Sequence, residues 1–179
     1  MASYYYLVAS LPMLRFEQDP PMSMEKFLSV CREFASSRDY MLIESVIGQA
    51  EEPKSSSYTK KWEEFNDLFR SSLSKQRLIQ LKRGQYETDS FRATRDDVDG
   101  TVKEAMQAAN PLDAEILLMK KTWEEASSLS QGKVFEVEVL LTYAIQLQIL
   151  LRKALFSQSE GNAEFRRLFS NLQSINQSM

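Results

Sequence analysis

The sequence predicts an all-α fold: a single compact helical domain over residues 1–179, with about six or seven helices around a central apolar helix at residues 134–156. Three observations predict it. Residues 137–151 carry apolar side chains on nearly every side of a helical wheel, which is typical of a helix surrounded by other elements. Most other segments repeat apolar residues at spacings of three and four. Glycines fall between predicted helices or at their ends, apart from Gly100, and no segment alternates convincingly with period two.

The central helix has one narrow polar stripe and a well-defined set of expected core positions. The stripe consists of Glu138, Thr142, Gln146 and Lys153. The core positions lie opposite or beside the stripe: Leu140, Tyr143, Ala144, Leu147 and Leu151. Acidic residues at its start and basic residues at its end suit the helix macrodipole.

The N-terminal third contains an apolar segment followed by two predicted helices. Residues 4–12 have no polar face at either period, so the pattern leaves strand and helix open, but we expect the segment to be buried. After a proline-containing loop, Ser23 is expected to cap a helix that ends near residue 35. Asp39 is expected to cap a second helix over residues 40–47, which Gly48 ends.

The middle of the chain predicts two further helices. Residues 58–83 contain neither glycine nor proline and form one long amphipathic helix, ended by Gly84. The next helix has two alternative starts, because Thr94 and Thr101 each open a capping box. The register of apolar residues across Gly100 favours the earlier start.

The last third predicts three helices, of which the central helix is the second. Asn110 is expected to cap a helix and Pro111 to occupy its first position, and this helix extends to Gly132. After the central helix, apolar residues at helical spacing predict a final amphipathic helix: Phe165, Leu168, Phe169 and Leu172.

Composition argues against most kinds of catalytic or cofactor site. The chain has no histidine, one cysteine and a formal net charge of −3. It therefore lacks the commonest general base and metal ligand, and shows no basic field for nucleic acid. Its glycines are too far apart for a phosphate-binding loop. We expect no enzyme activity, no cofactor and no catalytic or metal-binding residues, with Cys31 as a buried apolar side chain.

Acidic clusters are also expected to be structural. Residues 96–100 (DDVDG) fail as a calcium loop, because Arg95 and Met106 would occupy positions that require carboxylates. The pairs Glu63-Glu64 and Glu124-Glu125 point about 100° apart on helices, so we expect solvated faces.

The end of the long helix is basic and is the candidate partner-contact site. Its residues are Lys75, Arg77, Lys82 and Arg83. Cations near a helix C-terminus stabilise the macrodipole without any ligand, and this is the main interpretation. The alternative is contact with an acidic protein surface, with nucleic acid a minor third choice.

No segment matches a targeting or membrane-spanning signal. The apolar N-terminal run ends at Pro12 and has no preceding basic residue, unlike a signal peptide. The apolar stretch of the central helix is interrupted by polar residues and is shorter than the roughly 20 residues that span a bilayer. We expect a soluble cytoplasmic protein without direct membrane insertion.

Two blocks of sequence resemble a known family. The first is residues 4–12 (YYYLVASLP) with 20–23 (PPMS) and Phe27-Leu28, and the second is residues 110–115 (NPLDAE), Trp123 and residues 135–152. They resemble an uncharacterised bacterial family encoded among the subunits of V/A-type ATPases. Neither block carries a catalytic motif, and the family has no functional residues to transfer.

The resemblance implies a non-catalytic accessory or structural subunit of a proton- or sodium-translocating rotary ATPase. Such a subunit would stand where the helical socket subunit (C or d type) of the central stalk is expected. Its partners would be V/A-type ATPase subunits, which would hold it at the inner face of the cell membrane. The alternative is a free-standing helical adaptor that binds an unknown protein partner. The oligomeric state is not predicted.

Overall fold

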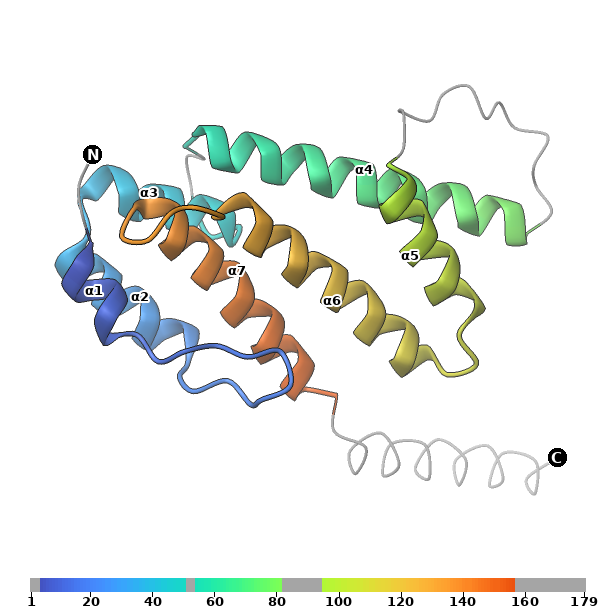
Figure 1. Ribbon diagram of the computed structural model, residues 1–179, viewed down its shortest axis with the longest axis horizontal. Helices are drawn as coiled ribbons and strands as arrows, with labels where there is room; N and C mark the ends of the chain where they lie inside the picture. The colour runs from blue at the N-terminus through green and yellow to red at the C-terminus, as the bar shows by residue number, and fades with distance from the viewer. Residues whose placement is uncertain (1–3, 51–53, 82–94, 157–179) are drawn as a thin grey trace, which may run out of the picture.

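The computed structural model describes residues 4–50, 54–81 and 95–156, and within these ranges it contains seven α-helices and no strand (Figure 1). The all-α prediction is therefore confirmed. The helices are α1 (Tyr5–Ser10), α2 (Met24–Phe34), α3 (Ser37–Val46), α4 (Ser57–Gln80), α5 (Asp96–Gln107), α6 (Pro111–Leu129) and α7 (Val137–Ala154).

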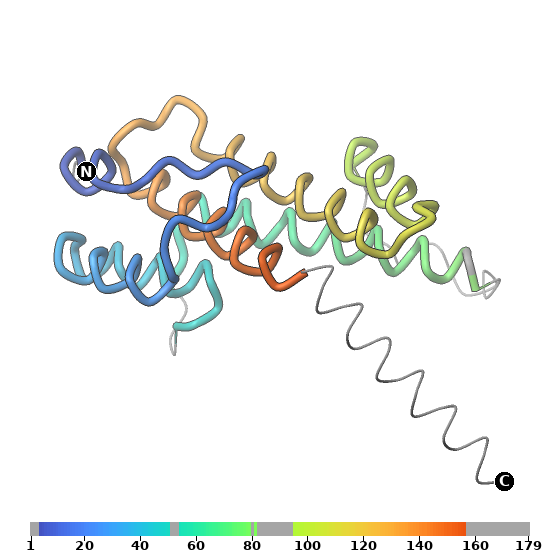
Figure 2. The backbone as a smooth tube through the Cα atoms, turned by 90° about the horizontal axis from the view of Figure 1, so that it is seen from below, coloured from blue at the N-terminus to red at the C-terminus, as the bar shows by residue number. Residues whose placement is uncertain are grey.

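The helices form two groups that share α7. α6 and α7 run antiparallel, α4 lies along α6, and α5 packs against α4 and α6 at the end farther from the N-terminus (Figure 1). α1, α2 and α3 gather at the opposite end, where α2 and α3 contact α7 (Figure 2). α7 thus joins the two groups, as expected of the central helix.

Burial along α7 confirms most of the expected core and corrects one position. Leu140, Ala144 and Leu147 are fully buried, whereas Tyr143 and Leu151 pack against the core from partly buried positions. Thr142 was expected on a polar stripe, but it is only 6% exposed. Its hydroxyl donates to the carbonyl of Ala126 at 3.1 Å and lies 2.9 Å from the hydroxyl of Tyr58. These partners satisfy the buried hydroxyl, which a wheel of α7 alone does not show.

Local capping chemistry explains the starts of α2, α3, α4 and α6 and the end of α3. The Ser23 side chain accepts from the backbone N–H of Lys26, and Asn110 with Pro111 begins α6, both as predicted. α3 ends before Gly48, whose φ of 74° is the left-handed conformation that favours glycine. The predicted cap of α3 is wrong: Ser36 caps the helix and accepts from the backbone N–H of Asp39, which lies in the first turn.

Several other boundaries differ from expectation. The central helix α7 covers Val137–Ala154 and not the predicted residues 134–156, and α6 ends at Leu129, before the predicted end near Gly132. α4 begins one residue earlier than predicted, because Ser56 and Thr59 form a capping box. α5 begins at Asp96, so the later start at Thr101 is wrong. α4 ends at Gln80, before its predicted end at residue 83. Gly84, the earlier α5 cap Thr94 and the final helix with Phe165 lie outside the described residues.

The N-terminal segment is helical, and its burial is only partial. Tyr4 and Leu7 are buried, but Tyr5 is 52% and Tyr6 86% exposed. The expectation that the whole segment is buried is therefore wrong. Consecutive residues on a helix point about 100° apart, so a six-residue helix resting on the bundle must present part of an all-apolar sequence to solvent.

The loop that follows α1 is held against α7 by hydrogen bonds from two α7 side chains. The hydroxyl of Tyr143 donates to the carbonyl of Pro12 at 3.0 Å. The ammonium of Lys153 donates to the carbonyl of Phe16 and lies 4.9 Å from the centre of its ring. These contacts join the loop after the N-terminal segment to α7.

Candidate interaction surface

The predicted basic site lies only partly within the described residues. Lys82 and Arg83 fall outside them. The ammonium of Lys75 lies 3.8 Å from a carboxylate oxygen of Asp99, whose other oxygen accepts from the hydroxyl of Ser72. Lys75 therefore helps to hold α5 on α4. Arg77 is exposed in the last turn of α4, where its charge suits the macrodipole.

One of the four glutamates expected on solvated faces is buried. Glu63, Glu64 and Glu124 are exposed, as predicted, but Glu125 is only 9% exposed. Its two carboxylate oxygens accept from the guanidinium of Arg95 at 2.8 and 3.0 Å. The solvated-face interpretation of Glu125 is therefore wrong, because its partner comes from the start of another helix.

Asp97 extends this ion-pair network between α5 and α6. It accepts from Arg95 at 2.8 Å and from Lys121 at 2.6 Å. The hydrogen bond from Arg95, followed by that from Lys121, holds the pKa of Asp97 well below its usual range. Each member of the network thus has a partner within the fold. No group of three or more His, Cys, Asp or Glu side chains in the described ranges could hold a metal ion.

Aromatic side chains form an exposed cluster beside α1. We call Tyr5, Tyr6, Val134 and Phe135 the aromatic surface. The ring centres of Tyr5 and Tyr6 lie 5.3 Å apart, and those of Tyr5 and Phe135 lie 4.7 Å apart, both edge-to-face. Val134 is 59% exposed and Phe135 is partly buried. Aromatic rings that remain exposed in such a cluster are typical of protein-binding surfaces.

Tyr4 holds the aromatic surface in place. Its backbone N–H donates to the carbonyl of Phe135 at 2.7 Å, which ties α1 to the loop before α7. Its hydroxyl donates to the carboxylate of Asp39 at 2.5 Å and accepts from the backbone N–H of Ser36 at 3.2 Å. Burial, and then the bond to Asp39, raises the pKa of the Tyr4 phenol. Tyr4 therefore remains a hydrogen-bond donor at neutral pH.

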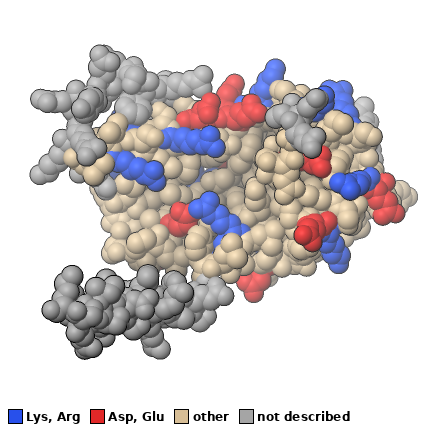
Figure 3. All heavy atoms as spheres, turned by 180° about the vertical axis from the view of Figure 1, so that it is seen from behind, with Lys and Arg blue, Asp and Glu red and all other residues tan. Residues whose placement is uncertain are grey.

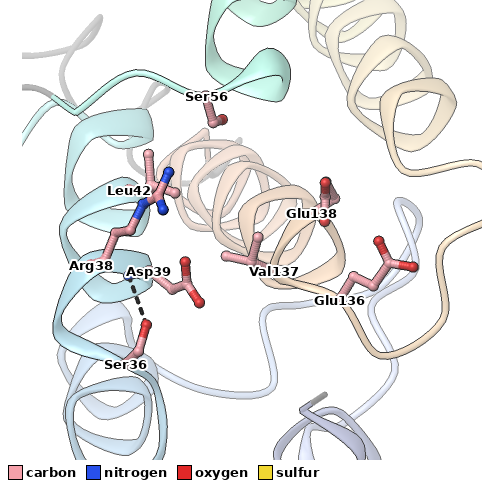
Figure 4. Close-up of a pocket in the computed structure, with 8 residues that line it drawn as sticks. All are labelled: Ser36, Arg38, Asp39, Leu42, Ser56, Glu136, Val137 and Glu138. Carbon is pink, nitrogen blue, oxygen red and sulfur yellow. Dashed lines mark hydrogen bonds between the residues drawn. The ribbon is translucent and has the colours of Figure 1, made fainter. Parts of the chain in front are cut away.

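A pocket opens beside Asp39, the partner of the Tyr4 hydroxyl, where α3, α4 and α7 begin (Figure 4). Its volume is about 370 Å³. We call it the acidic pocket, because three carboxylates and one guanidinium line it. The lining residues are Ser36, Arg38, Asp39, Leu42, Ser56, Glu136, Val137 and Glu138.

The three carboxylates of the acidic pocket differ in how they are satisfied. Asp39 accepts from Tyr4, and Glu136 accepts from the ammonium of Lys133 at 2.5 Å. Glu138 lies in the first turn of α7, and its Oε2 atom is buried with no hydrogen-bond partner among the described residues. In Figure 4 the Asp39 side chain points toward the start of α7, and Glu136 lies at the far edge of the pocket.

One face of the molecule is mixed in charge (Figure 3). On the face shown in Figure 3, lysine and arginine side chains lie interspersed with aspartate and glutamate. None of the helices in the described ranges is long and apolar enough to cross a membrane.

The aromatic surface was missed in the sequence, although a signal was present. Tyr4, Tyr5 and Tyr6 are consecutive, and three consecutive residues of a helix cannot all face one neighbour. Which of them is exposed depends on Phe135 and Asp39, which only the folded chain brings close.

Comparisons with protein-family models, curated proteins and solved structures find no match for this chain.

Proposed function

We propose that this protein is a non-catalytic accessory or structural subunit of a proton- or sodium-translocating V/A-type rotary ATPase, associated with its central stalk. In this proposal it lies in the cytoplasm, at the inner face of the membrane that holds the ATPase. The function is one of binding and shape, for which an all-helical fold is suited.

One observation carries the proposal: the two sequence blocks that resemble the ATPase-associated family meet at the aromatic surface. Tyr5 and Tyr6 belong to the first block and Phe135 to the second, and Tyr4 bonds to the backbone of Phe135. Tyr6 is 86% exposed, so these rings add little to the core of this chain. Burial of exposed aromatic rings in an interface would stabilise a complex.

A pull-down from native membranes tests the proposal. Tagged wild-type protein should recover the ATPase A and B subunits. A Tyr5→Ser/Tyr6→Ser variant should recover at least about tenfold less, because interface tyrosines are often hot spots. Met13→Ala is the matched control, since Met13 is an exposed apolar residue outside the aromatic surface. Thermal unfolding should show that all variants are folded.

Charge reversal at Lys82 and Arg83 forms a second arm of the same experiment. Reduced recovery would add these two residues to the interface, whereas unchanged recovery would confine the interface to the aromatic surface. Recovery of no ATPase subunit by the wild type would end the ATPase proposal. A different protein recovered in a tyrosine-dependent manner would favour the free-standing helical adaptor.

A further inference from the structure

We propose that the aromatic surface and the acidic pocket together bind a partner segment that carries lysine or arginine close to an apolar or aromatic residue. The cation would enter the acidic pocket while the apolar residue packs on Tyr5, Tyr6 and Phe135. This inference deepens the proposed function and rests on it in assuming a protein partner, but it concerns the chemistry of recognition and names no particular subunit.

The first argument is the charge of the acidic pocket. Asp39, Glu136 and Glu138 face a single lining cation, Arg38. Lys133, which does not line the pocket, offsets the charge of Glu136 through its ion pair. An added cation would therefore meet an excess of negative charge, and the desolvated walls of a pocket strengthen that attraction.

The second argument is the unsatisfied oxygen of Glu138. Its Oε2 atom is buried without a hydrogen bond, which costs free energy unless a donor arrives. The positive end of the α7 macrodipole stabilises the charge of this carboxylate but supplies no donor to Oε2. A lysine ammonium or an arginine guanidinium in the acidic pocket would supply both a donor and a positive charge, once the Glu138 side chain turns Oε2 from its buried position toward the pocket.

The third argument is that the other polar groups of the pocket favour an organic cation over a metal ion. The hydroxyl oxygens of Ser36 and Ser56 already accept from the backbone N–H groups of Asp39 and Thr59. The carboxylates belong to no group of three that could hold a metal in the described part of the chain. A volume of about 370 Å³ lies at the small end of ligand-binding cavities, which run from roughly 300 to 1,000 Å³.

The fourth argument is the distance between the two features. Tyr4 connects them, because its backbone bonds to Phe135 and its hydroxyl bonds to Asp39. The Phe135 carbonyl and the Asp39 carboxylate are thus no farther apart than one tyrosine residue and the hydrogen bonds at its two ends, 2.7 and 2.5 Å. In an extended peptide, side chains two positions apart point the same way and lie roughly 7 Å apart. A cation and an aromatic residue at positions i and i+2 would therefore reach both features.

Titration of the full chain with short peptides tests the inference. The probe is acetyl-Arg-Ala-Phe-amide, and the matched controls replace arginine with citrulline, its neutral isostere, or with glutamate. Backbone amide shifts in NMR spectra of labelled protein should change around Asp39, Phe135 and Glu138. Removing the charge should weaken binding at least about fivefold, because the cation is the main source of selectivity.

A Glu138→Gln variant distinguishes recognition of the cation from nonspecific peptide binding. Its affinity for the arginine peptide should fall at least about fivefold, while its affinity for the citrulline peptide stays within about twofold. Glu124→Gln, an exposed glutamate on α6, should change neither affinity. Equal binding of the arginine and citrulline peptides, shifts confined to other parts of the chain, or no binding at millimolar peptide would each overturn the inference.

The outcome is independent of the membrane pull-down. If the peptides do not bind but the ATPase is recovered in a tyrosine-dependent manner, the inference about the cation is wrong and the proposed function stands. Selective peptide binding without recovery of any ATPase subunit would leave the recognition chemistry and remove the ATPase as the partner.

Discussion

Replacement of Arg95 by alanine should destabilise the protein more than removal of any charge from an exposed face. The side chain of Glu125 is 10% exposed, and both of its oxygens accept from the Arg95 guanidinium. Arg95→Ala would leave that carboxylate buried without its cation and without two charge-assisted hydrogen bonds. The variant therefore measures what it costs to bury Glu125 alone.

The expected magnitude follows from the different exposure of the two partners. Breaking a fully buried ion pair costs about 3–5 kcal/mol, and breaking an exposed one about 0.2–1 kcal/mol. The Arg95 side chain is 42% exposed, so solvent screens part of the interaction. We expect Arg95→Ala to lower the free energy of unfolding by about 2 kcal/mol, between these limits. Asp97 also loses Arg95, but it keeps Lys121 and is itself half exposed, so its share is small.

Urea denaturation at pH 7 of a double-mutant cycle is the assay. The cycle contains Arg95→Ala, Glu125→Leu and the double variant, with Glu124→Gln as the exposed control. Because the double variant buries no charge, it should recover part of the loss, with a coupling of about 1–2 kcal/mol. The control should change stability by less than about 0.5 kcal/mol. A cost of Arg95→Ala below about 0.5 kcal/mol at unchanged m-value, or additive single variants, would refute this reasoning.

Three other predictions concern the core, the Cys31 thiol and the loss of stability at acidic pH. Leu147→Ala should cost about 2–5 kcal/mol in the same denaturation assay, because Leu147 is fully buried; a cost below about 1 kcal/mol would contradict its placement. Burial raises the pKa of Cys31 to about 12, so Ellman's reagent at pH 8 should label native protein at least about 100-fold more slowly than urea-unfolded protein; comparable rates would argue against burial. Because the pKa of Asp97 is lower in the folded than in the unfolded protein, its charged carboxylate stabilises the fold above about pH 4, the pKa of an unfolded aspartate. This stabilisation is lost as the pH falls through the pKa of the folded state. The stability gap between wild type and Asp97→Asn should therefore shrink from about pH 5 to about pH 2, and a constant gap would exclude this role.

Helix identity, apart from that of α1, and some helix boundaries could be predicted because their signals are local. Ser23, Gly48 and the Asn110-Pro111 pair act within one turn of the helix that they bound. The central position of α7 follows from its composition, since a helix that is apolar on nearly every side needs neighbours on every side.

Burial of single polar groups could not be predicted, because their partners are remote in sequence. Glu125 and Thr142 occupy positions that a helical wheel treats as polar. Their hydrogen-bond partners, Arg95 and Tyr58, come close only in the folded chain and satisfy these buried polar groups there. The aromatic surface is similar: three consecutive tyrosines imply that one is exposed, but Phe135 decides where the exposed rings gather.

The short length of α1 has a consequence for binding. A helix of six residues has no stability of its own in water, so α1 exists only while Tyr4 and Leu7 dock it to the bundle. It can therefore open and close as a unit without global unfolding, and its amides should exchange with solvent faster than those of α7. Any fraction of time that α1 spends undocked reduces the apparent affinity of the aromatic surface by that fraction. A partner that binds only the docked form would in turn slow exchange in α1, so the N-terminal amides would report on binding even where no side chain touches the partner.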